Sequence, residues 1–292
     1  MNVVAIGGGH GLSATATALR MIDHLTLSAI VGTTDNGGST GDIRKWSNCI
    51  AWGDLRHVLN SLTELKSPTM QSRLFEFRFG EHEGPLSEES LGNIMLHALE
   101  HIADRPQHAL DMVCEWLEVD ARVIPMSEEV TDLVAEAGNE RISGETQVDH
   151  MRSLPRRLKL SNPVSATPEA IAAIEAADLI ILGPGSVMTS VLPSLLVTDV
   201  QNALVASTAQ KIWVQNQGHE EGPMGRLATE DTHQWLESIL GFDYCDAILA
   251  DKSADASNIS KRVILADLKD DVDATRYSVA KLSAEFRRLL SA

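Results

Sequence analysis

The stretch VVAIGGGHGLSATATALRM, residues 3–21, decides the fold class. Its first four residues, Val3 to Ile6, are apolar and predict a short buried strand, and the glycines that follow predict a tight turn. The alanines and leucines between Leu12 and Met21 then predict a helix. A strand, a glycine turn and a helix in this order are typical of the first unit of a nucleotide-binding α/β sheet.

The same order begins again in LSAIVGTTDNGGSTG, residues 27–41, where an apolar run from Leu27 to Val31 leads into a second glycine-rich loop. Further strands are predicted at Leu179–Leu182, Lys211–Gln215 and Ala247–Ala250. Further helices are predicted at Asp54–Leu65, Ser90–Ala103, Pro106–Leu117, Pro168–Ala177 and Thr229–Leu240, and after Ala274.

Strands that alternate with helices predict an α/β fold with a doubly wound, mostly parallel, Rossmann-like sheet. Between about residues 120 and 160 the pattern changes to short β-like segments, which predict a small antiparallel β excursion. These segments are Ala121–Pro125, Thr131–Ala135 and Arg141–Val148. Because we find no repeat and no linker, we expect residues 1–292 to form a single domain.

The charge of the chain limits its partners. The 292 residues carry a net charge of −17, so the average surface repels polyanions, and we expect neither nucleic acid binding nor membrane insertion. Residues 1–60 contain four acidic and four basic side chains, so this whole excess lies in residues 61–292. The neutral start of the chain is also the part that contains the first two glycine loops.

The cysteines and the N-terminus indicate a cytoplasmic protein. Cys49, Cys114 and Cys245 are far apart and show no C-x-x-C spacing, so we interpret them as reduced thiols. Met1 and Asn2 lead directly into the first strand without a basic leader, and no apolar run approaches the roughly 20 residues that span a bilayer.

The first glycine loop predicts anion binding. Residues 9–14 fit the pattern G-x-G-x-x-[GA], in which small residues let a phosphate approach free N–H groups at a helix N-terminus. In a nicotinamide-dinucleotide site Asp35 would hold a ribose, but here Asp35 opens a second glycine loop. We therefore favour phosphate binding over NAD binding, with His10 as a candidate phosphate contact or acid/base group.

The second loop resembles two enzyme motifs only superficially. Gly37, Ser39 and Gly41 fit G-x-S-x-G, but a hydrolase elbow follows a strand in the middle of the sheet, and this loop follows only the second strand. A P-loop is excluded because Gly38 and Ser39 stand where Lys and Ser are required. We interpret residues 35–41 as a nest of backbone amides that binds an anion.

Three later segments have a similar character. Asp54 is either a simple helix cap or part of the site, while Arg56 could contact a phosphate with two hydrogen bonds. Gly92 lies at a helix start, where a close approach by a ligand or another helix would explain a glycine. The loop after the strand Leu179–Leu182 supplies amides and hydroxyls at the edge where such sheets bind ligands. Asp35 and Asp54 could hold Mg²⁺.

Taken together, these motifs resemble the "putative gluconeogenesis factor" family, whose fold is shared with 2-phospho-L-lactate transferase. The matching motifs follow the family order and span residues 1 to about 216. They are Gly7-Gly8-Gly9-His10-Gly11-Leu12, Thr34-Asp35-Asn36-Gly37-Gly38-Ser39-Thr40-Gly41, Gly53-Asp54-Leu55-Arg56, Leu91-Gly92-Asn93, Gly144-Glu145-Thr146 and Leu182-Gly183-Pro184-Gly185-Ser186 with Thr189-Ser190.

The resemblance implies a cytoplasmic protein that binds a nucleotide sugar of the UDP-N-acetylglucosamine kind and regulates carbon metabolism and cell shape or wall synthesis. It adds Asn216 to the candidate site. The candidate ligand-binding residues are then Gly8, Gly9, His10, Gly11, Asp35, Asn36, Gly37, Gly38, Ser39, Gly41, Arg44, Asp54, Arg56, Gly92, Asn93, Gly183, Pro184, Gly185, Ser186, Thr189, Ser190 and Asn216, with Asp35 and Asp54 as the candidate metal ligands.

The chain departs from the family pattern at three places, one of which is His57, where relatives often have Asn after Gly-Asp-x-Arg. Glu88 and Glu89 stand where relatives commonly have Gly-His, and these acids add repulsion near a bound phosphate. The Thr-Gln-Pro-Gly-Glu-Thr stretch of many relatives is replaced by residues 217–222.

Two other functions stay open at this point. One is an Mg²⁺-dependent transferase that joins a GDP-activated phospholactate to a deazaflavin. The other is a scaffold that acts through a homodimer surface. We expect a homo-oligomer, in the simplest case a dimer, and we assign no catalytic residue.

Overall fold

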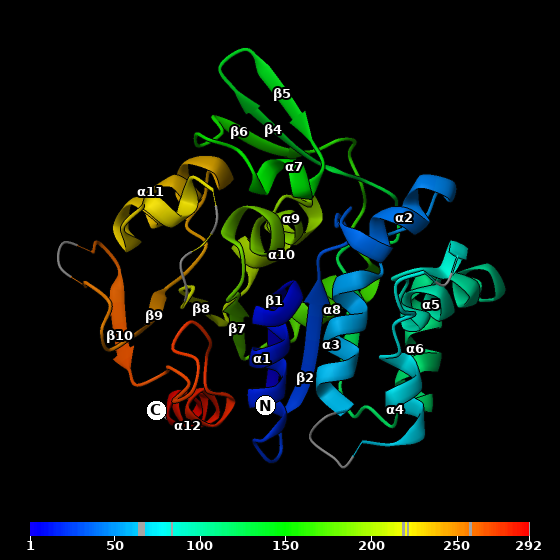
Figure 1. Cartoon of the computed structure of the whole chain (residues 1–292). Helices are drawn as coiled ribbons and strands as arrows, with labels where there is room; N and C mark the ends of the chain where they lie inside the picture. Colours follow the sequence, from blue (N-terminus) through cyan, green and yellow to red (C-terminus); the bar gives the residue numbers. More distant parts are fainter. Residues whose placement is uncertain (64–67, 83, 218–219, 221, 257–258, 292) are drawn as a thin grey trace.

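The chain folds around a seven-stranded sheet in which every strand is parallel to its neighbours (Figure 1). This computed structural model describes residues 1–63, 68–82, 84–217, 220, 222–256 and 259–291. The strand order is β10-β9-β8-β7-β1-β2-β3. The strands are β1 Asn2–Gly7, β2 Thr26–Val31, β3 Arg122–Pro125, β7 Leu179–Leu182, β8 Gln210–Val214, β9 Ala247–Asp251 and β10 Arg262–Ala266.

The sheet separates two apolar cores, because successive side chains of a strand point to opposite faces. In β1, Val3 and Ala5 belong to one core and Val4 and Ile6 to the other. Helices cover both faces, as the doubly wound prediction requires. The first core takes side chains from α1 Gly9–Arg20, α3 Gly53–Thr63, α5 Leu91–Ile102, α6 Pro106–Trp116 and α12 Val279–Leu290, and the second from α8 Pro168–Glu175, α9 Leu192–Leu195, α10 Thr198–Ala206 and α11 Thr229–Leu240.

The direction of winding reverses at β1. From β1 the chain builds outward through β2 and β3, then returns to the other side of β1 with β7 and builds outward through β8, β9 and β10. The turns that follow β1 and β7 therefore leave the same edge of the sheet beside each other, since Ile6 pairs with Leu182 in parallel. Open α/β sheets bind ligands at such a reversal point.

The predicted antiparallel excursion is confirmed, with different members. A three-stranded antiparallel sheet has the order β5-β4-β6, with β4 Leu133–Ala137, β5 Glu140–Ser143 and β6 Arg157–Leu160. The segment Ala121–Pro125 was wrongly assigned to it, because β3 pairs in parallel with β2 at the edge of the main sheet. The predicted strand Arg141–Val148 is interrupted at Gly144, whose φ of 98° ends the strand before α7 Glu145–Asp149.

The second glycine loop is shorter than predicted. Helix α2 spans Gly38–Trp46, so Ser39 and Gly41 lie in its first turn and not in a loop. The helix begins with a hydrogen bond from the N–H of Gly41 to the carbonyl of Gly37 at 2.9 Å. The motif is thus a second strand, turn and helix unit that follows the first in sequence.

The remaining predicted helices are present with small shifts of their ends, and Leu65, at the predicted end of α3, lies outside the described residues. Helix α4 Met70–Phe75, β6, α9, α10 and β10 were not predicted. In the part of the chain that the structure describes, no helix is long and apolar enough to cross a membrane.

Candidate functional site

The turns after β1 and β7 touch each other at the reversal point. A Cβ atom added to Gly11 would collide with the backbone carbonyl of Pro184, and one added to Gly8 would collide with the Asp54 carboxylate. Gly183 has a φ of 77° and Gly185 a φ of 140°, which glycine adopts without strain. These glycines allow three chain segments to approach more closely than residues with side chains could.

A cavity of about 450 Å³ opens beside these two turns. Four chain segments contribute to its wall: the start of α1, the turn after β7, the segment after β8 and the segment before α12. The polar or glycine lining residues among those predicted from sequence are His10, Gly11, Gly185 and Asn216, together with Pro184.

Asn216 stands at the junction between the β7 turn and the segment after β8. Its Oδ1 accepts a hydrogen bond from the N–H of Gly185 at 2.9 Å, and its Nδ2 donates to Glu220 at 3.1 Å. Glu220 also accepts from the N–H of Val187 at 2.6 Å. Asn216 therefore holds the shape of the β7 turn. Residues 218, 219 and 221, which belong to the stretch 217–222 that differs from the family pattern, lie outside the described residues.

Sequence reasoning missed the part of the cavity wall that comes from residues 275–277. Arg276 brings a positive charge to the lining and is exposed, paired only loosely with Asp273 at 3.3 Å. Tyr277 donates a hydrogen bond to the carbonyl of Gln215, which ties this segment to the end of β8. Nothing in the local sequence marks these residues, because only the docking of α12 against α1 brings them to the cavity.

A group of four carboxylates lies next to the glycine turns. Asp35 follows β2, Asp54 starts α3, and Glu145 and Asp149 belong to α7. Burial, followed by the charge of Asp35, raises the pKa of Asp54 to about 7. Burial also raises the pKa of Asp35, and burial followed by the charges of Asp54 and Asp35 raises that of Glu145 well above its usual range.

Backbone N–H and hydroxyl groups donate some hydrogen bonds to the carboxylates of this cluster, but these bonds offset only part of the cost of burying the charges. Asp35 accepts from the N–H of Gly37 at 2.8 Å, and Glu145 accepts from the Thr34 hydroxyl at 3.4 Å. The N–H of Gly9 donates to Asp54 and lowers its pKa, but less than burial raises it. The raised pKa values of Asp35, Asp54 and Glu145 indicate that this part of the cluster is short of positive charge, so a cation would be stabilised here.

The loop after β7 contacts the same cluster from the other side. The hydroxyls of Ser186 and Thr189 donate to Oδ1 of Asp149 at 3.3 and 2.9 Å. An added Cβ on Gly9 would lie 4.0 Å from the Ser190 hydroxyl oxygen. Of the three predicted hydroxyl residues, Ser186 and Thr189 therefore contact the acidic cluster and Ser190 lies beside the first glycine turn.

Asn36 ties the turn after β2 to the small antiparallel sheet. Its Oδ1 accepts from the N–H and the hydroxyl of Thr146 at 3.0 and 3.1 Å, and its Nδ2 donates to Gln147 at 3.0 Å. Gly37 lies beside Thr146, whereas a Cβ on Gly38 would meet no atom within 4 Å among the described residues. Position 41 requires a glycine for a different reason, because an added Cβ would collide with the Asn36 carbonyl.

Arg44 is a support for this turn. Its guanidinium donates to the carbonyls of Thr34, Asp35, Cys49 and Thr131 at 3.4, 3.0, 3.3 and 3.0 Å. It also pairs with Asp132 at 2.9 Å, and its side chain is 9% exposed. All five N–H donors of the guanidinium are thus engaged within the protein, so neutralising a ligand would require Arg44 to leave them.

Arg56, Asn93 and Ser39 form a buried network beneath the site. Arg56, 3% exposed, donates to Asn93 Oδ1 at 3.0 Å and to Glu76 at 2.7 Å. The Ser39 hydroxyl donates to Glu89 at 2.6 Å and accepts from Asn93 Nδ2 at 3.2 Å. Glu89 therefore faces Ser39 in the interior, not an incoming phosphate.

Gly92 is explained by packing within this network. An added Cβ would collide with the Phe75 carbonyl and lie 2.9 Å from Cδ of Arg56. Of the two approaches that the sequence left open, a protein segment is the one observed, through the end of α4 and a side chain of α3.

His10 lies against His57, with the ring centroids 4.9 Å apart. Burial, followed by the charge of Arg56, lowers the pKa of His57 to about 3, and Nη2 of Arg56 donates to His57 Nε2 at 2.9 Å. A neutral His57 therefore connects the buried network to the His10 side of the cavity.

The predicted residues thus fall into two main groups. Around the cavity and the acidic cluster lie Gly8, Gly9, His10, Gly11, Asp35, Asp54, Gly183, Pro184, Gly185, Ser186, Thr189, Ser190 and Asn216. Supporting contacts within the protein engage Asn36, Ser39, Arg44, Arg56, Gly92 and Asn93.

Known proteins of similar sequence and structure resemble the chain along nearly its whole length. Residues 3–286 match the family described as "2-phospho-L-lactate transferase CofD". A "putative gluconeogenesis factor" of Pasteurella multocida is 42% identical over 291 residues, covering 99% of this chain and 93% of that protein. One of Vibrio cholerae is 45% identical over 249 residues, covering 85% and 83%.

Solved structures agree with these relatives. A crystal structure of a protein from Bacillus halodurans has a TM-score of 0.87 with 27% identity, covering 98% of this chain and 99% of that one. A second, described as a member of the UPF0052 family from the same organism, has a TM-score of 0.85 with 26% identity, covering 97% and 98%.

Proposed function

Because this chain belongs to the CofD family and has close relatives named as putative gluconeogenesis factors, we propose that it binds a nucleotide sugar of the UDP-N-acetylglucosamine kind. In this proposal it acts as a cytoplasmic regulator of gluconeogenic carbon metabolism and of cell shape or wall synthesis. The supporting observation is the contact between the two glycine turns, Gly11 against Pro184, beside a cavity of about 450 Å³.

The chemistry of the cavity suits a diphosphate with a sugar. His10 and Gly11, in the first turn of α1, line the cavity, and the dipole of a helix favours negative charge at its N-terminus. Arg276 adds an exposed positive charge, and a cavity of this size falls in the range of small-ligand sites. The side chain of Gln217 offers an amide group for sugar hydroxyls.

Calorimetric titration with UDP-N-acetylglucosamine, UDP and GDP, each with and without Mg²⁺, tests the proposal. We expect the nucleotide sugar to bind with a stoichiometry of one per chain and more tightly than UDP, because the sugar adds contacts. A chain that binds none of the three nucleotides contradicts the proposal.

A second candidate function is an Mg²⁺-dependent phospholactate-type transferase, which the family match and the acidic cluster favour. Carboxylate oxygens are the donors that Mg²⁺ prefers, so Asp35 and Asp54 fit this ion, with Glu145 beside them. When bound, the ion would neutralise phosphate charge during transfer. The residues of the chain would position both substrates against it.

This enzymatic function predicts that GDP and a deazaflavin both bind only with Mg²⁺, and that product forms when the activated donor is supplied. Asp35→Asn should abolish product formation. A deazaflavin whose fluorescence does not change when protein and Mg²⁺ are added rules out this function and leaves the regulatory proposal standing.

A further inference from the structure

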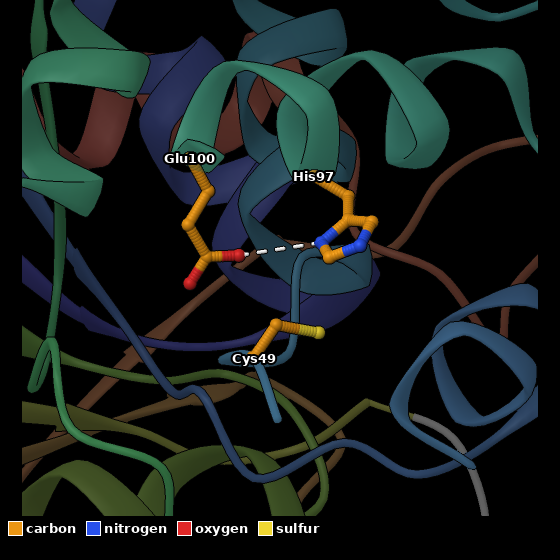
Figure 2. A group of neighbouring side chains, drawn as sticks. All are labelled: Cys49, His97 and Glu100. Carbon is orange, nitrogen blue, oxygen red and sulfur yellow. Dashed lines mark hydrogen bonds and ion pairs between the residues drawn. The ribbon is translucent and has the colours of Figure 1, made fainter. Parts of the chain in front are cut away.

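A group of side chains with metal-ligand chemistry lies outside the cavity described above. Cys49, in the segment between α2 and α3, faces His97 and Glu100 on α5 (Figure 2). One ligand atom from each residue, the sulfur, a ring nitrogen and a carboxylate oxygen, lies within 4.8 Å of the other two.

The two residues on α5 already have the spacing of ligands that share an ion. They are three residues apart and so lie on one face of the helix. His97 Nδ1 and Glu100 Oε2 are 3.4 Å apart. Tetrahedral zinc, with bonds of about 2.0–2.2 Å to nitrogen and oxygen, needs its ligand atoms about 3.3–3.5 Å apart.

Neighbouring groups hold the other donors in place. The Cys49 carbonyl accepts from Nε of Arg44 at 3.3 Å, and the Cys49 N–H donates to the Ser47 carbonyl at 3.1 Å. The indole N–H of Trp52 donates to Glu100 Oε2 at 3.0 Å, which orients the carboxylate. Ligands that are held by such outer contacts are typical of metal sites.

His101 contacts the His97 ring at Nε2, the ring nitrogen that does not face Glu100. Its Nε2 lies 3.4 Å from Nε2 of His97. With Nδ1 of His97 on a cation, the proton of that ring sits on Nε2 and is donated to His101, which then accepts it. A metal-binding histidine almost always donates its second N–H in this way.

We propose that Cys49, His97 and Glu100 bind a borderline-soft divalent cation, of which zinc fits the mixed sulfur, nitrogen and oxygen donors best. The thiolate and the carboxylate balance the charge of the ion. An open pocket lined by Glu100 and by Asn48, the neighbour of Cys49, gives a route from solvent to the site. His101 acts as a positioning residue.

The signal for this site was present in the sequence, and we missed it. Residues 97–101 read HALEH, an H-x-x-E-H pattern with two histidines one turn apart. Our expectation of metal ligands was confined to Asp35 and Asp54. In zinc peptidases with this pattern both histidines bind the metal, whereas here the fold places Cys49 opposite His97 and Glu100.

Titration of the full chain with Co²⁺ tests the proposal, because a thiolate ligand produces a charge-transfer band in the near ultraviolet. We expect one equivalent per chain to generate the band, and Zn²⁺, but not Mg²⁺, to displace the cobalt. His101→Ala should keep the band and weaken binding about 10- to 100-fold.

Cys49→Ser should lose the band, and Cys114→Ser, its matched control, should keep it. His97→Ala tests the same site at a side chain that is 22% exposed, with His108→Ala as its control. A band that survives Cys49→Ser or His97→Ala, or that never forms in the unaltered chain, overturns the proposal. Magnesium binding at Asp35 and Asp54 is independent of every one of these outcomes.

Discussion

The first turn of α3 carries two charged side chains, Asp54 and Arg56, whose charges are balanced very differently. Arg56 is buried but bonded to Glu76, Asn93 and His57. Asp54 faces the glycine turns beside Asp35 and Glu145, and its pKa rises to about 7 because burial and like charge both oppose ionisation.

This difference separates support from binding. A buried charge with partners on every side stabilises the fold and has no capacity left for a ligand. A cluster of carboxylates without enough positive charge keeps an unfavourable energy that a cation or a protonated ligand would relieve. The Asp54 side of α3 is therefore the side on which a cation would be stabilised, whereas the contacts of Arg56 lie within the protein.

The largest effect is expected from Arg56→Met. Removing the guanidinium leaves the buried Asn93 and the Glu76 carboxylate, which is 35% exposed, without their partner, which should lower the free energy of unfolding by about 3 kcal/mol. Urea denaturation measures this. Arg73→Met, at an exposed position of α4, is the control and should change stability by less than about 0.5 kcal/mol. If the two variants lose the same free energy of unfolding, the buried contacts of Arg56 do not stabilise the fold.

Gly11→Ala should destabilise the chain by about 1 to 3 kcal/mol, because the new methyl group meets the Pro184 carbonyl and forces the two turns apart. Helix propensity alone predicts the opposite sign, a gain of about 1 kcal/mol, since Gly11 lies within α1. The sign of the change in thermal denaturation decides between them. Stabilisation would contradict the close contact.

Asp54→Asn should alter how stability depends on pH. Burial and the charge of Asp35 raise the pKa of Asp54 from its ordinary value of 3.8 to about 7 in the folded chain, so the folded chain binds more protons than the unfolded chain between these two pH values. Stability should therefore fall as pH rises from about 4 to 7, by up to about 1.4 kcal/mol per unit from this group. The variant should lose that slope in denaturation measured at several pH values. If stability depends on pH in the same way in the variant, then burial and the neighbouring charges do not raise the pKa of Asp54.

The smallest effect on the fold is expected from Arg276→Gln. Arg276 is exposed at the mouth of the cavity, so stability should not change measurably. Affinity for the nucleotide sugar should fall about tenfold through loss of one charge-assisted contact. Calorimetry with UDP-N-acetylglucosamine measures this, with Arg73→Gln as the control. Unchanged affinity would place the phosphates away from Arg276.

Local patterns predicted most of the sheet. Strands such as Leu179–Leu182 are uninterrupted apolar runs, and helices such as Thr229–Leu240 show a clear apolar face, so burial alone specifies them. Strand β10 and the segment that bears Arg276 were missed, because exposed side chains there hide the pattern. Glycine motifs predicted where close approaches occur, but not which approach involves a ligand and which a protein segment, as Gly92 illustrates.

The sequence by itself determined the fold class, the family resemblance and the glycine turns, because these depend on interactions between residues near each other in the chain. Only the tertiary structure decided the roles of individual polar residues. Arg44 and Arg56 look alike in sequence as candidate phosphate ligands, yet both are engaged within the protein. Cys49 and His97, 48 residues apart in the chain, become neighbours only when α5 packs in place. The charge and solvation of a side chain depend on its neighbours in space, and the chain sets those only when it folds.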